Sequence, residues 1–579
     1  MNKVFRRSLL GVAVSTALVL SGCATHSDKL GFAEREGTKT YAEAYEPARQ
    51  MFQQGQWDQL REKLNINASK EVTVEVKSED GQVSQETKTE KLTNEEEKER
   101  LIKEQSELAI VERGLMTLNV GDFKRALFYF DAAEEKLGLA ETDDTIGTKA
   151  SSVGKSGLAM LIGAEEMANY EMRGYEKVML LNYKALCYML MGDRKAYNVT
   201  RRAIDLQQAE WEKFQEILVE LKKKKEERAE MAKKNIEAND QEIISLKNEI
   251  AETEKELADY INSPTYRNDK LSATYVNMFN KTIAEKKERI AFKQEMNAEW
   301  AEDLTDDPTV STSDVDDRSA EVKVKASSVA SAYVNPFGDY LNAMMMEIDG
   351  FDDSTMRQNA KIAYKKVLEN NKDCVAAKQA VKDVEKGLKK NQKLVQIILS
   401  DGFSPYQLEK TKTFKIPLKK RVVNAIVNYS SATPVPTLTK SARILVNGKT
   451  TKLSSLTKME SLILRDEQDR MPMRAAMFAM AALRTTATGA FLGNLGSSLT
   501  ASMQHPDTRS WLSLPNQVYV ARIAVPKNQK TLKLETLDEK GAVLTKQDVK
   551  LATDGPTVVY AVSFDKNMQV YANAFSWVD

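Results

Sequence analysis

The sequence is poor in cysteine and histidine. Its 579 residues include only three cysteines and two histidines, His26 and His505. This inventory nearly excludes a metal site made of His and Cys ligands. Neither a G-x-S-x-G nor an H-E-x-x-H motif is present, so two common hydrolase signatures are missing. We therefore predict a protein without a cofactor, a metal ion or an enzymatic activity.

An excess of charge of one sign is also lacking. The chain contains 84 basic and 84 acidic residues, and three of the basic residues lie within the first 22. The remaining chain is therefore slightly acidic, which argues against nucleic acid as a partner. Beyond residue 22, every apolar run is interrupted by charges or turn residues before it is long enough to cross a bilayer.

Two cysteines, Cys187 and Cys374, lie far from the N-terminus. A disulfide bridge between them is allowed in an oxidising compartment. Both residues stand beside apolar residues in helical patterns, and this setting favours two buried thiols over a bridge.

The N-terminal residues have the order of a secretory signal. Three basic residues, Lys3, Arg6 and Arg7, precede an apolar run over residues 9–20 that is too short to span a bilayer. This run ends in Leu20-Ser21-Gly22-Cys23, which resembles the lipobox of bacterial lipoproteins. The alternative is an ordinary signal peptide with a chance cysteine.

The lipobox resemblance implies a membrane anchor. In that family the signal peptide is cleaved before the cysteine and the thiol is acylated, so residues 1–22 would be removed and Cys23 would carry acyl chains. Several chains together hold a protein stably at a membrane. An aspartate after the cysteine retains family members at the inner membrane, whereas Ala24 stands here, which implies the outer membrane, facing the periplasm. Residues 23–39 are small and polar and are predicted to form a tether.

Helical repeats are predicted over residues 40–205 and 326–400. Residues 114–133 resemble a tetratricopeptide repeat, in which a small residue lets two helices approach and an aromatic residue fills the gap beside it. Lys124 and Arg125 follow the turn of this repeat and are expected to face solvent. The residues expected to pack it are Gly114, Gly121, Phe123, Ala126, Phe130 and Ala133.

Weaker copies of the repeat begin at Ala48, Ala185 and Asn335. Unrelated helical hairpins are the alternative for these copies. Within the first block, valines alternate with polar residues ahead of an Asp-Gly turn. A polar hairpin or a mobile loop is therefore predicted as an insertion over residues 66–94.

A long charged segment, residues 206–302, is predicted to form an antiparallel coiled-coil hairpin. Apolar residues recur every seven positions from Ile236 to Leu257, which is typical of a coiled coil. Pro264 then breaks the helix, and a second helical stretch follows. The acidic, Ser/Thr-rich residues 303–325 are predicted to be a linker.

Residues 410–579 are predicted to form an antiparallel β-sandwich-like domain, because short β-branched segments alternate with Pro, Gly and Asn-Gly turns. A helical insertion over residues 466–505 interrupts it. Capping of an open end of the sheet is favoured over membrane contact for this insertion, since its apolar stretch between Arg474 and Arg484 is too short to span a bilayer. The chain is thus predicted to be an α+β multidomain protein.

Two further motifs accompany the lipobox, Asn335-Pro336-Phe337 and the run D-T-R-S-W-L-S-L-P from Asp507 to Pro515. Together the three motifs resemble a family of large tetratricopeptide-repeat-containing lipoproteins of Gram-negative bacteria. The resemblance implies a role in the cell envelope and offers no reaction. From their chemistry, Asp507 and Arg509 are expected to pair, and Trp511 is expected to seal the sheet edge.

The predicted function is that of a protein–protein interaction scaffold or adaptor in cell-envelope assembly. Acyl chains on Cys23 would hold it to the outer membrane, and its partner would be an unidentified periplasmic or envelope protein. Repeat solenoids offer concave binding surfaces for such partners. The alternative is a protein that binds or modifies peptidoglycan or another glycan. Glycan hydrolysis needs a carboxylate pair in a cleft, and the acidic residues are too many to single out a pair.

Overall fold

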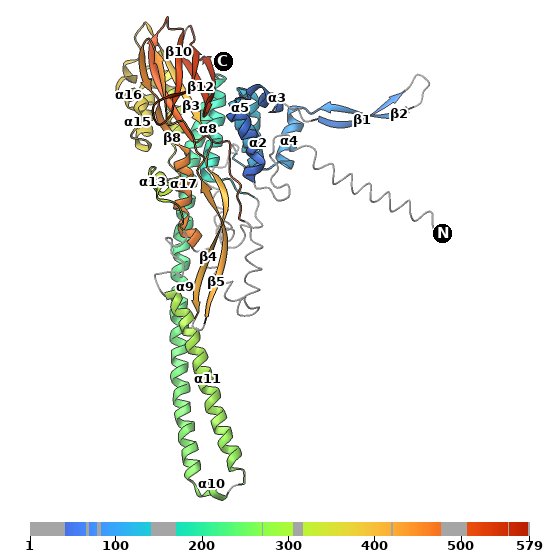
Figure 1. The fold of residues 1–579 in the computed structure, drawn as a ribbon, viewed down its shortest axis with the longest axis vertical. Coiled ribbons are helices and arrows are strands. Elements are labelled where there is room, and N and C mark those ends of the chain that lie inside the picture. The colour runs from blue at the N-terminus through green and yellow to red at the C-terminus, as the bar shows by residue number, and fades with distance from the viewer. Residues whose placement is uncertain are drawn as a thin grey trace.

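Figure 1 shows the fold of the chain, a computed structural model with an elongated α+β architecture. The structure describes residues 41–64, 69–77, 83–139, 170–268, 270–304, 316–418, 421–475, 506–553 and 555–576. The predicted signal peptide, Cys23, the tether and most of the helical insertion lie outside these ranges. The prediction of an α+β chain is confirmed.

Packed helices form the first part of the body, and side-chain caps set where several of them begin. Thr93 and Glu96 form a reciprocal capping box at the start of α4. Between α5 and α6, Gly121 has a φ of 86° and Asp122 caps α6. The helices are α2 (Tyr41–Gln53), α3 (Trp57–Leu64), α4 (Asn94–Glu104), α5 (Glu107–Asn119), α6 (Phe123–Lys136) and α8 (Gly174–Leu190).

A two-stranded antiparallel ribbon leaves the body between α3 and α4. Its strands are β1 (Ser69–Lys77) and β2 (Val83–Lys91), with Ser69 opposite Lys91. The ribbon projects sideways in Figure 1. Of the two alternatives for this segment, hairpin or loop, the structure has the hairpin.

The longest element is α9 (Lys195–Asn262), a single helix of 68 residues. Its first turns pack on α8 in the body, and its later turns pack on α11 (Ser272–Leu304). The short helix α10 (Pro264–Asn268) joins the two at the lower end of Figure 1. The chain therefore reverses at Pro264, and no break separates the predicted repeats from the predicted hairpin.

A second group of helices packs against the sheets. The side-chain oxygen of Asn335 accepts the N–H of Phe337 at 3.0 Å, which shapes the turn into α14. Asp353 caps α15 by accepting the N–H groups of Thr355 and Met356. These elements are α13 (Ala320–Ser327), α14 (Phe337–Asp349), α15 (Ser354–Asn370), α16 (Val375–Asp383), η1 (Val384–Lys386) and α17 (Met459–Asp469).

Two sheets and a second ribbon form the remainder. The first sheet has the order β13-β12-β3-β9-β8, and the second has the order β11-β10-β6-β7. The ribbon consists of β4 (Tyr406–Leu418) and β5 (Arg421–Thr433). The sheet strands are β3 (Gln392–Asp401), β6 (Ser441–Val446), β7 (Lys449–Lys452), β8 (Ser454–Lys458), β9 (Gln517–Pro526), β10 (Thr531–Leu537), β11 (Val543–Lys550), β12 (Thr557–Phe564) and β13 (Asn567–Ala574).

The central strand β3 corrects two predictions. It pairs parallel with β12, so the sheet is mixed rather than antiparallel. It also lies within residues 326–400, which were predicted to be helical. Its side chains are buried on both faces: Val395 and Ile397 pack toward the second sheet, and Ile398 packs toward the helices. A short run that is apolar on both faces has no period that distinguishes a strand from a helix.

One apolar core joins the helices to the first sheet. It includes residues from α2 to α16 together with residues of β3, β9 and β12. The ring of Phe52 on α2, for example, lies 6.3 Å from that of Phe403 and 5.0 Å from that of Phe564. The boundary predicted near residue 410 therefore does not separate two independent cores.

Candidate interaction surfaces and the contacts that hold them

Of the six residues predicted to pack residues 114–133, Gly121 and Phe123 face Tyr571 on β13, and the other four lie on α5 and α6. Phe130 is fully buried, and a Cβ atom on Gly114 would come within 2.6 Å of its ring. Ala126 and Ala133 are buried on the same helix. Phe123 is half-buried and meets the ring of Tyr571 on β13 edge-on at 5.6 Å. A small residue at position 114 is thus required by the approach of Phe130, as the sequence predicts.

The two cations after this turn do not share one environment. Lys124 is exposed, as expected. Arg125 is half-buried: it pairs with Glu97 on α4, and its guanidinium lies 4.5 Å from the ring centroid of Phe128. The expectation that Arg125 faces solvent is wrong, because the repeat pattern places the residue on α6 but not the preceding helix that covers it.

Two buried carboxyl groups hold the segment from Asp507 to Pro515 against the helices. Glu112 on α5 accepts the N–H of Leu512 at 2.6 Å and that of Ser513 at 2.9 Å. Glu176 on α8 accepts the N–H of Trp511 at 2.8 Å. Both glutamates have no exposed surface. We call this set of contacts the glutamate clasp, and it connects the first helices to the loop before β9.

Burial dominates the electrostatics of the clasp. It raises the pKa of the Glu112 carboxyl from 4.5 to about 8, although the hydrogen bonds from residues 512 and 513 oppose the shift. Burial likewise raises the pKa of Glu176, against the hydrogen bonds from Tyr170 and Trp511. The negative charge of either glutamate disfavours ionisation of the other. Burial therefore disfavours the charged form of both glutamates.

The motif residues of this loop are only partly placed as predicted. Asp507 and Arg509 pair through two hydrogen bonds, at 2.9 Å and 2.8 Å. Trp511 does not seal the sheet edge. It is 1% exposed, its ring meets that of Tyr183 on α8 at 6.3 Å, and its indole N–H donates to Ser513 Oγ at 2.8 Å. The helices cover the residue, and the motif alone does not reveal them.

A second buried pair joins α14 to the first sheet. Arg522 on β9 donates from Nε to both oxygens of Glu347 at 2.8 Å. Gln396 on β3 and the hydroxyl of Tyr364 on α15 donate to the same carboxylate, at 3.0 Å and 2.8 Å. The pair is almost completely buried, with side-chain exposures of 5% and 7%. Such a geometry fixes the helices on the sheet, since neither charge is stable there alone.

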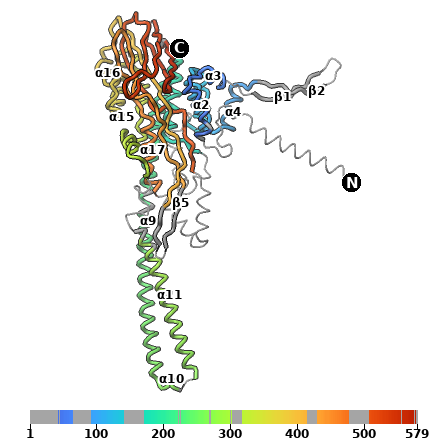
Figure 2. The backbone as a smooth tube through the Cα atoms, viewed as in Figure 1, coloured from blue at the N-terminus to red at the C-terminus, as the bar shows by residue number. Residues whose placement is uncertain are grey.

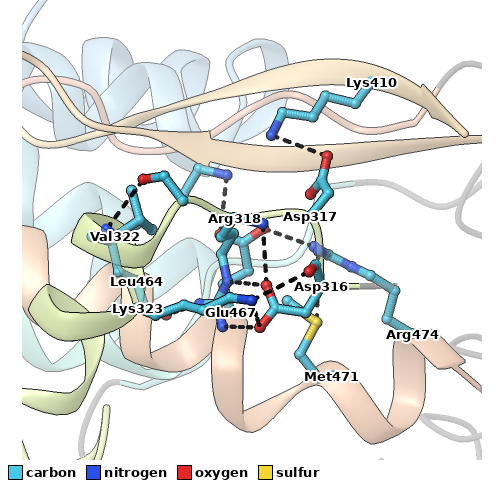
Figure 3. Close-up of polar contacts among 12 residues, drawn as sticks. Asp316, Asp317, Arg318, Val322, Lys323, Lys410, Leu464, Glu467, Met471 and Arg474 are labelled. Carbon is cyan, nitrogen blue, oxygen red and sulfur yellow. Dashed lines mark hydrogen bonds and ion pairs between the residues drawn. The ribbon is translucent and has the colours of Figure 1, made fainter. Parts of the chain in front are cut away.

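A third polar cluster braces the base of the β4–β5 ribbon (Figure 3). Arg318 is 6% exposed, pairs with Asp316 and donates to the Leu464 carbonyl of α17 at 3.0 Å. Asp317 accepts the hydroxyl proton of Tyr429 on β5 at 2.7 Å and pairs with Lys410 on β4 at 3.5 Å.

These contacts correct the expectation for the acidic segment between the hairpin and the second helical group. From residue 316 onward most of its residues are exposed, but Arg318 is buried and α13 packs on α17, so this part is attached to the body rather than a loose linker. The acidic composition that predicts a linker instead supplies partners for Arg318 and Lys410. The ribbon and the returning chain are therefore held together at one point.

The α9–α11 pair is held by an apolar seam and by charged pairs beside it. Ile243, Leu246 and Ile250 of α9 pack with Ile283 and Ile290 of α11. Ion pairs cross between the helices, from α11 cations at positions 286, 287, 289 and 293 to glutamates of α9. The seam follows the seven-residue spacing read from the sequence.

The base of this helix pair is attached to the body. Phe214 and Ile217 of α9 form a small buried cluster with Tyr333 and Met473. The remainder of α9 and α11 extends away from the body in Figure 1.

Both described cysteines are buried free thiols, as favoured from the sequence. Burial raises the pKa of Cys187 and of Cys374, which lowers the thiolate fraction and the reactivity of each.

Within the described ranges, no group of three or more His, Cys, Asp or Glu side chains could hold a metal ion, and no helix is long and apolar enough to cross a membrane. Comparisons of the chain with protein-family models, with curated proteins and with solved structures give no significant match.

Sequence reasoning missed the glutamate clasp and the Glu347–Arg522 pair. A weak signal was present: Glu112 and Glu176, each followed by a cation, interrupt mainly apolar helical runs, L-A-I-V-E-R-G-L-M and G-Y-E-K-V-M-L-L. A charge on an apolar helix face is expected to have a buried partner. That partner lies hundreds of residues away in the chain, and no local pattern predicts which residue it is.

Proposed function

We propose that the chain is a scaffold or adaptor protein of the cell envelope, held at the outer membrane by acyl chains on Cys23 and facing the periplasm. Its helical body would consist of tetratricopeptide-like repeats, and its α9–α11 arm would be an antiparallel coiled coil. The seam of Ile243, Leu246 and Ile250 with its flanking ion pairs supports the coiled-coil part. The close contact of Gly114 with Phe130 supports the repeat part.

One observation carries the scaffold proposal: three arms leave a body whose parts are fixed to one another. The arms are the β1–β2 ribbon, the β4–β5 ribbon and the α9–α11 pair (Figure 1). The glutamate clasp, the Glu347–Arg522 pair and the cluster around Arg318 join distant segments of the chain. Arms on such a body keep a defined geometry, which is useful for holding partners apart or together.

For the glycan-binding alternative, the sheet domain has two tryptophans that could stack on a sugar, Trp511 and Trp577, and Trp577 lies outside the described residues. A sugar-stacking surface needs an exposed aromatic ring, and Trp511 is 1% exposed. For this reason we keep only the scaffold proposal.

The anchor half of the proposal is tested by Cys23→Ala in cells that make the full chain. We expect uncleaved or soluble protein in place of the outer-membrane form, because acylation supplies the stable attachment. A variant that is still processed and tightly bound to the outer membrane would contradict the anchor.

The scaffold half is tested with a photo-crosslinking residue at one position on each of three surfaces. Suitable exposed positions are Ile244 on the hairpin, Thr413 on the β4–β5 ribbon and Ile362 on α15. We expect a discrete protein adduct from at least one arm, and its loss when that arm is deleted. Adducts with glycan strands alone, from any position, would contradict a protein scaffold.

A further inference from the structure

The free end of the α9–α11 pair has an exposed apolar face. Leu271, Tyr275 and Met278 follow the i, i+4, i+7 spacing of one helix face at the start of α11. Their exposed fractions are 56%, 42% and 61%, and Ile261 at the end of α9 is 40% exposed. We call these four residues the tip face. Its residues lie within eighteen positions of one another, around the turn formed by α10.

An aromatic cluster beneath the tip face holds it in place. The ring of Tyr260 lies 5.7 Å from Tyr266, 6.0 Å from Tyr275 and 6.4 Å from Phe279. The turn is also tied by Ser263, whose hydroxyl donates to the Tyr260 carbonyl at 2.7 Å. The exposed side chains therefore extend from an ordered platform.

The end of the hairpin carries two cations, Arg267 and Lys270, with the acidic Asp269 between them in the sequence. Arg267 in α10 and Lys270 just after it are exposed at the far end of the long axis (Figure 2). The exposed acidic residues Glu256 and Asp259 lie farther back along α9. The end of the arm thus combines aliphatic side chains, a tyrosine and cations, which is the composition of surfaces that lie at membrane interfaces.

We propose that the tip face binds the surface of a membrane containing anionic lipids. The tyrosine and aliphatic side chains would enter the interfacial region, and Arg267 and Lys270 would contact the phosphate groups. A stable protein–protein contact buries about 800 Å² on each partner, and four side chains at the end of a helical turn are too few to supply this area. A lipid surface needs no such area and no complementary shape.

This contact would be separate from the lipid anchor. α11 has 33 residues, and at about 1.5 Å per residue it places the tip roughly 50 Å from the other end of that helix. With Cys23 acylated, the chain would contact lipid through two separate segments. The tip contact does not require acylation. Loss of vesicle binding by the tip would therefore leave the anchor proposal intact, and an unanchored Cys23→Ala variant would leave the tip proposal intact.

The test uses a chain that begins at residue 24, so that no acyl chain can contribute. Binding is measured by co-flotation with phosphatidylcholine vesicles, with and without phosphatidylglycerol. We expect binding to the anionic vesicles, weakened by salt because the cations contribute, and little binding to the neutral ones.

Matched double variants locate the contact. Leu271→Asp with Met278→Asp should weaken binding to the anionic vesicles by roughly tenfold or more, because two apolar groups become charges that the lipid repels. Ile244→Asp with Phe292→Asp makes the same chemical change on the shaft, at side chains that are 59% and 58% exposed. This control should bind as the unchanged chain does.

A fluorescent residue gives an independent readout. With Met278→Trp, the added emission should shift to the blue when anionic vesicles are present, whereas Phe292→Trp should show no shift. The proposal is overturned if the chain binds neither kind of vesicle, or if the shaft variant weakens binding as much as the tip variant. It is also overturned if sedimentation shows a dimer that the tip variant dissociates, since the tip face would then be a contact between two copies.

Discussion

The glutamate clasp predicts an unusual loss of stability as the pH rises. Burial raises the pKa of Glu112 from 4.5 to about 8, so between these values the folded chain keeps a proton that the unfolded chain has released. The contribution of this proton to stability is complete below about pH 4.5 and is lost as the pH rises through about 8. The shift corresponds to on the order of 5 kcal/mol.

The assay is urea unfolding at several pH values between about 5 and 8, monitored by tryptophan fluorescence. Trp511 is a suitable reporter because it is buried and its backbone N–H donates to Glu176. The chain has only two histidines, so carboxyl groups dominate titration in this range. Other buried carboxyl groups, among them Asp401 with a pKa raised to about 6 by burial, contribute in the same direction.

Comparison with Glu112→Gln isolates the contribution of one residue. This variant cannot titrate, and its amide can accept from only one of the N–H groups of residues 512 and 513. We expect it to be less stable than the wild type at pH 5 by about 1–3 kcal/mol and to have a shallower dependence on pH. The control Glu104→Gln, at an exposed position on α4, should show the same dependence of stability on pH as the wild type. A wild-type stability that rises from pH 5 to 8, or equal slopes for wild type and Glu112→Gln, would refute the reasoning.

Five further changes test how the rest of the body is held. Phe130→Ala should lower the free energy of unfolding by about 3–5 kcal/mol, because it leaves a cavity beside Gly114. Lys124→Glu should change it by less than about 0.5 kcal/mol, whereas Arg125→Glu should be clearly destabilising because it replaces an ion pair with a repulsion. Glu347→Ala should cost about 1.5–3 kcal/mol, since the buried Arg522 would lose this carboxylate and keep only its pair with Asp383. Deletion of residues 228–302, replaced by a short Gly/Ser bridge, should leave a single cooperative melt.

Each of these outcomes has a clear opposite. A stable Phe130→Ala variant would mean that the faces of α5 and α6 are wrongly assigned. Equal effects of the changes at positions 124 and 125 would remove the distinction between their environments. Loss of the cooperative melt on deletion would show that the hairpin belongs to the core of the body.

The sequence by itself determined the features that depend on neighbouring residues. The turn at Gly121 and the cap at Asp122, the seven-residue seam of α9 and the reversal at Pro264 were all readable from it. Each rests on a local rule, either the backbone freedom of glycine, the period of a helix or the missing N–H of proline. The polar hairpin of β1 and β2 also followed from local alternation.

Only the tertiary structure decided which charges are buried. The N–H of Leu512 is bound by a glutamate 400 residues earlier in the chain, and Arg125 is covered by a helix that precedes its own repeat. The parallel pairing of β3 with β12 likewise joins residues far apart. A local pattern gives the face on which a residue lies, but desolvation depends on what covers that face. That covering segment is chosen by packing of the whole chain, and so the clasp and its pKa shift appear only in the folded molecule.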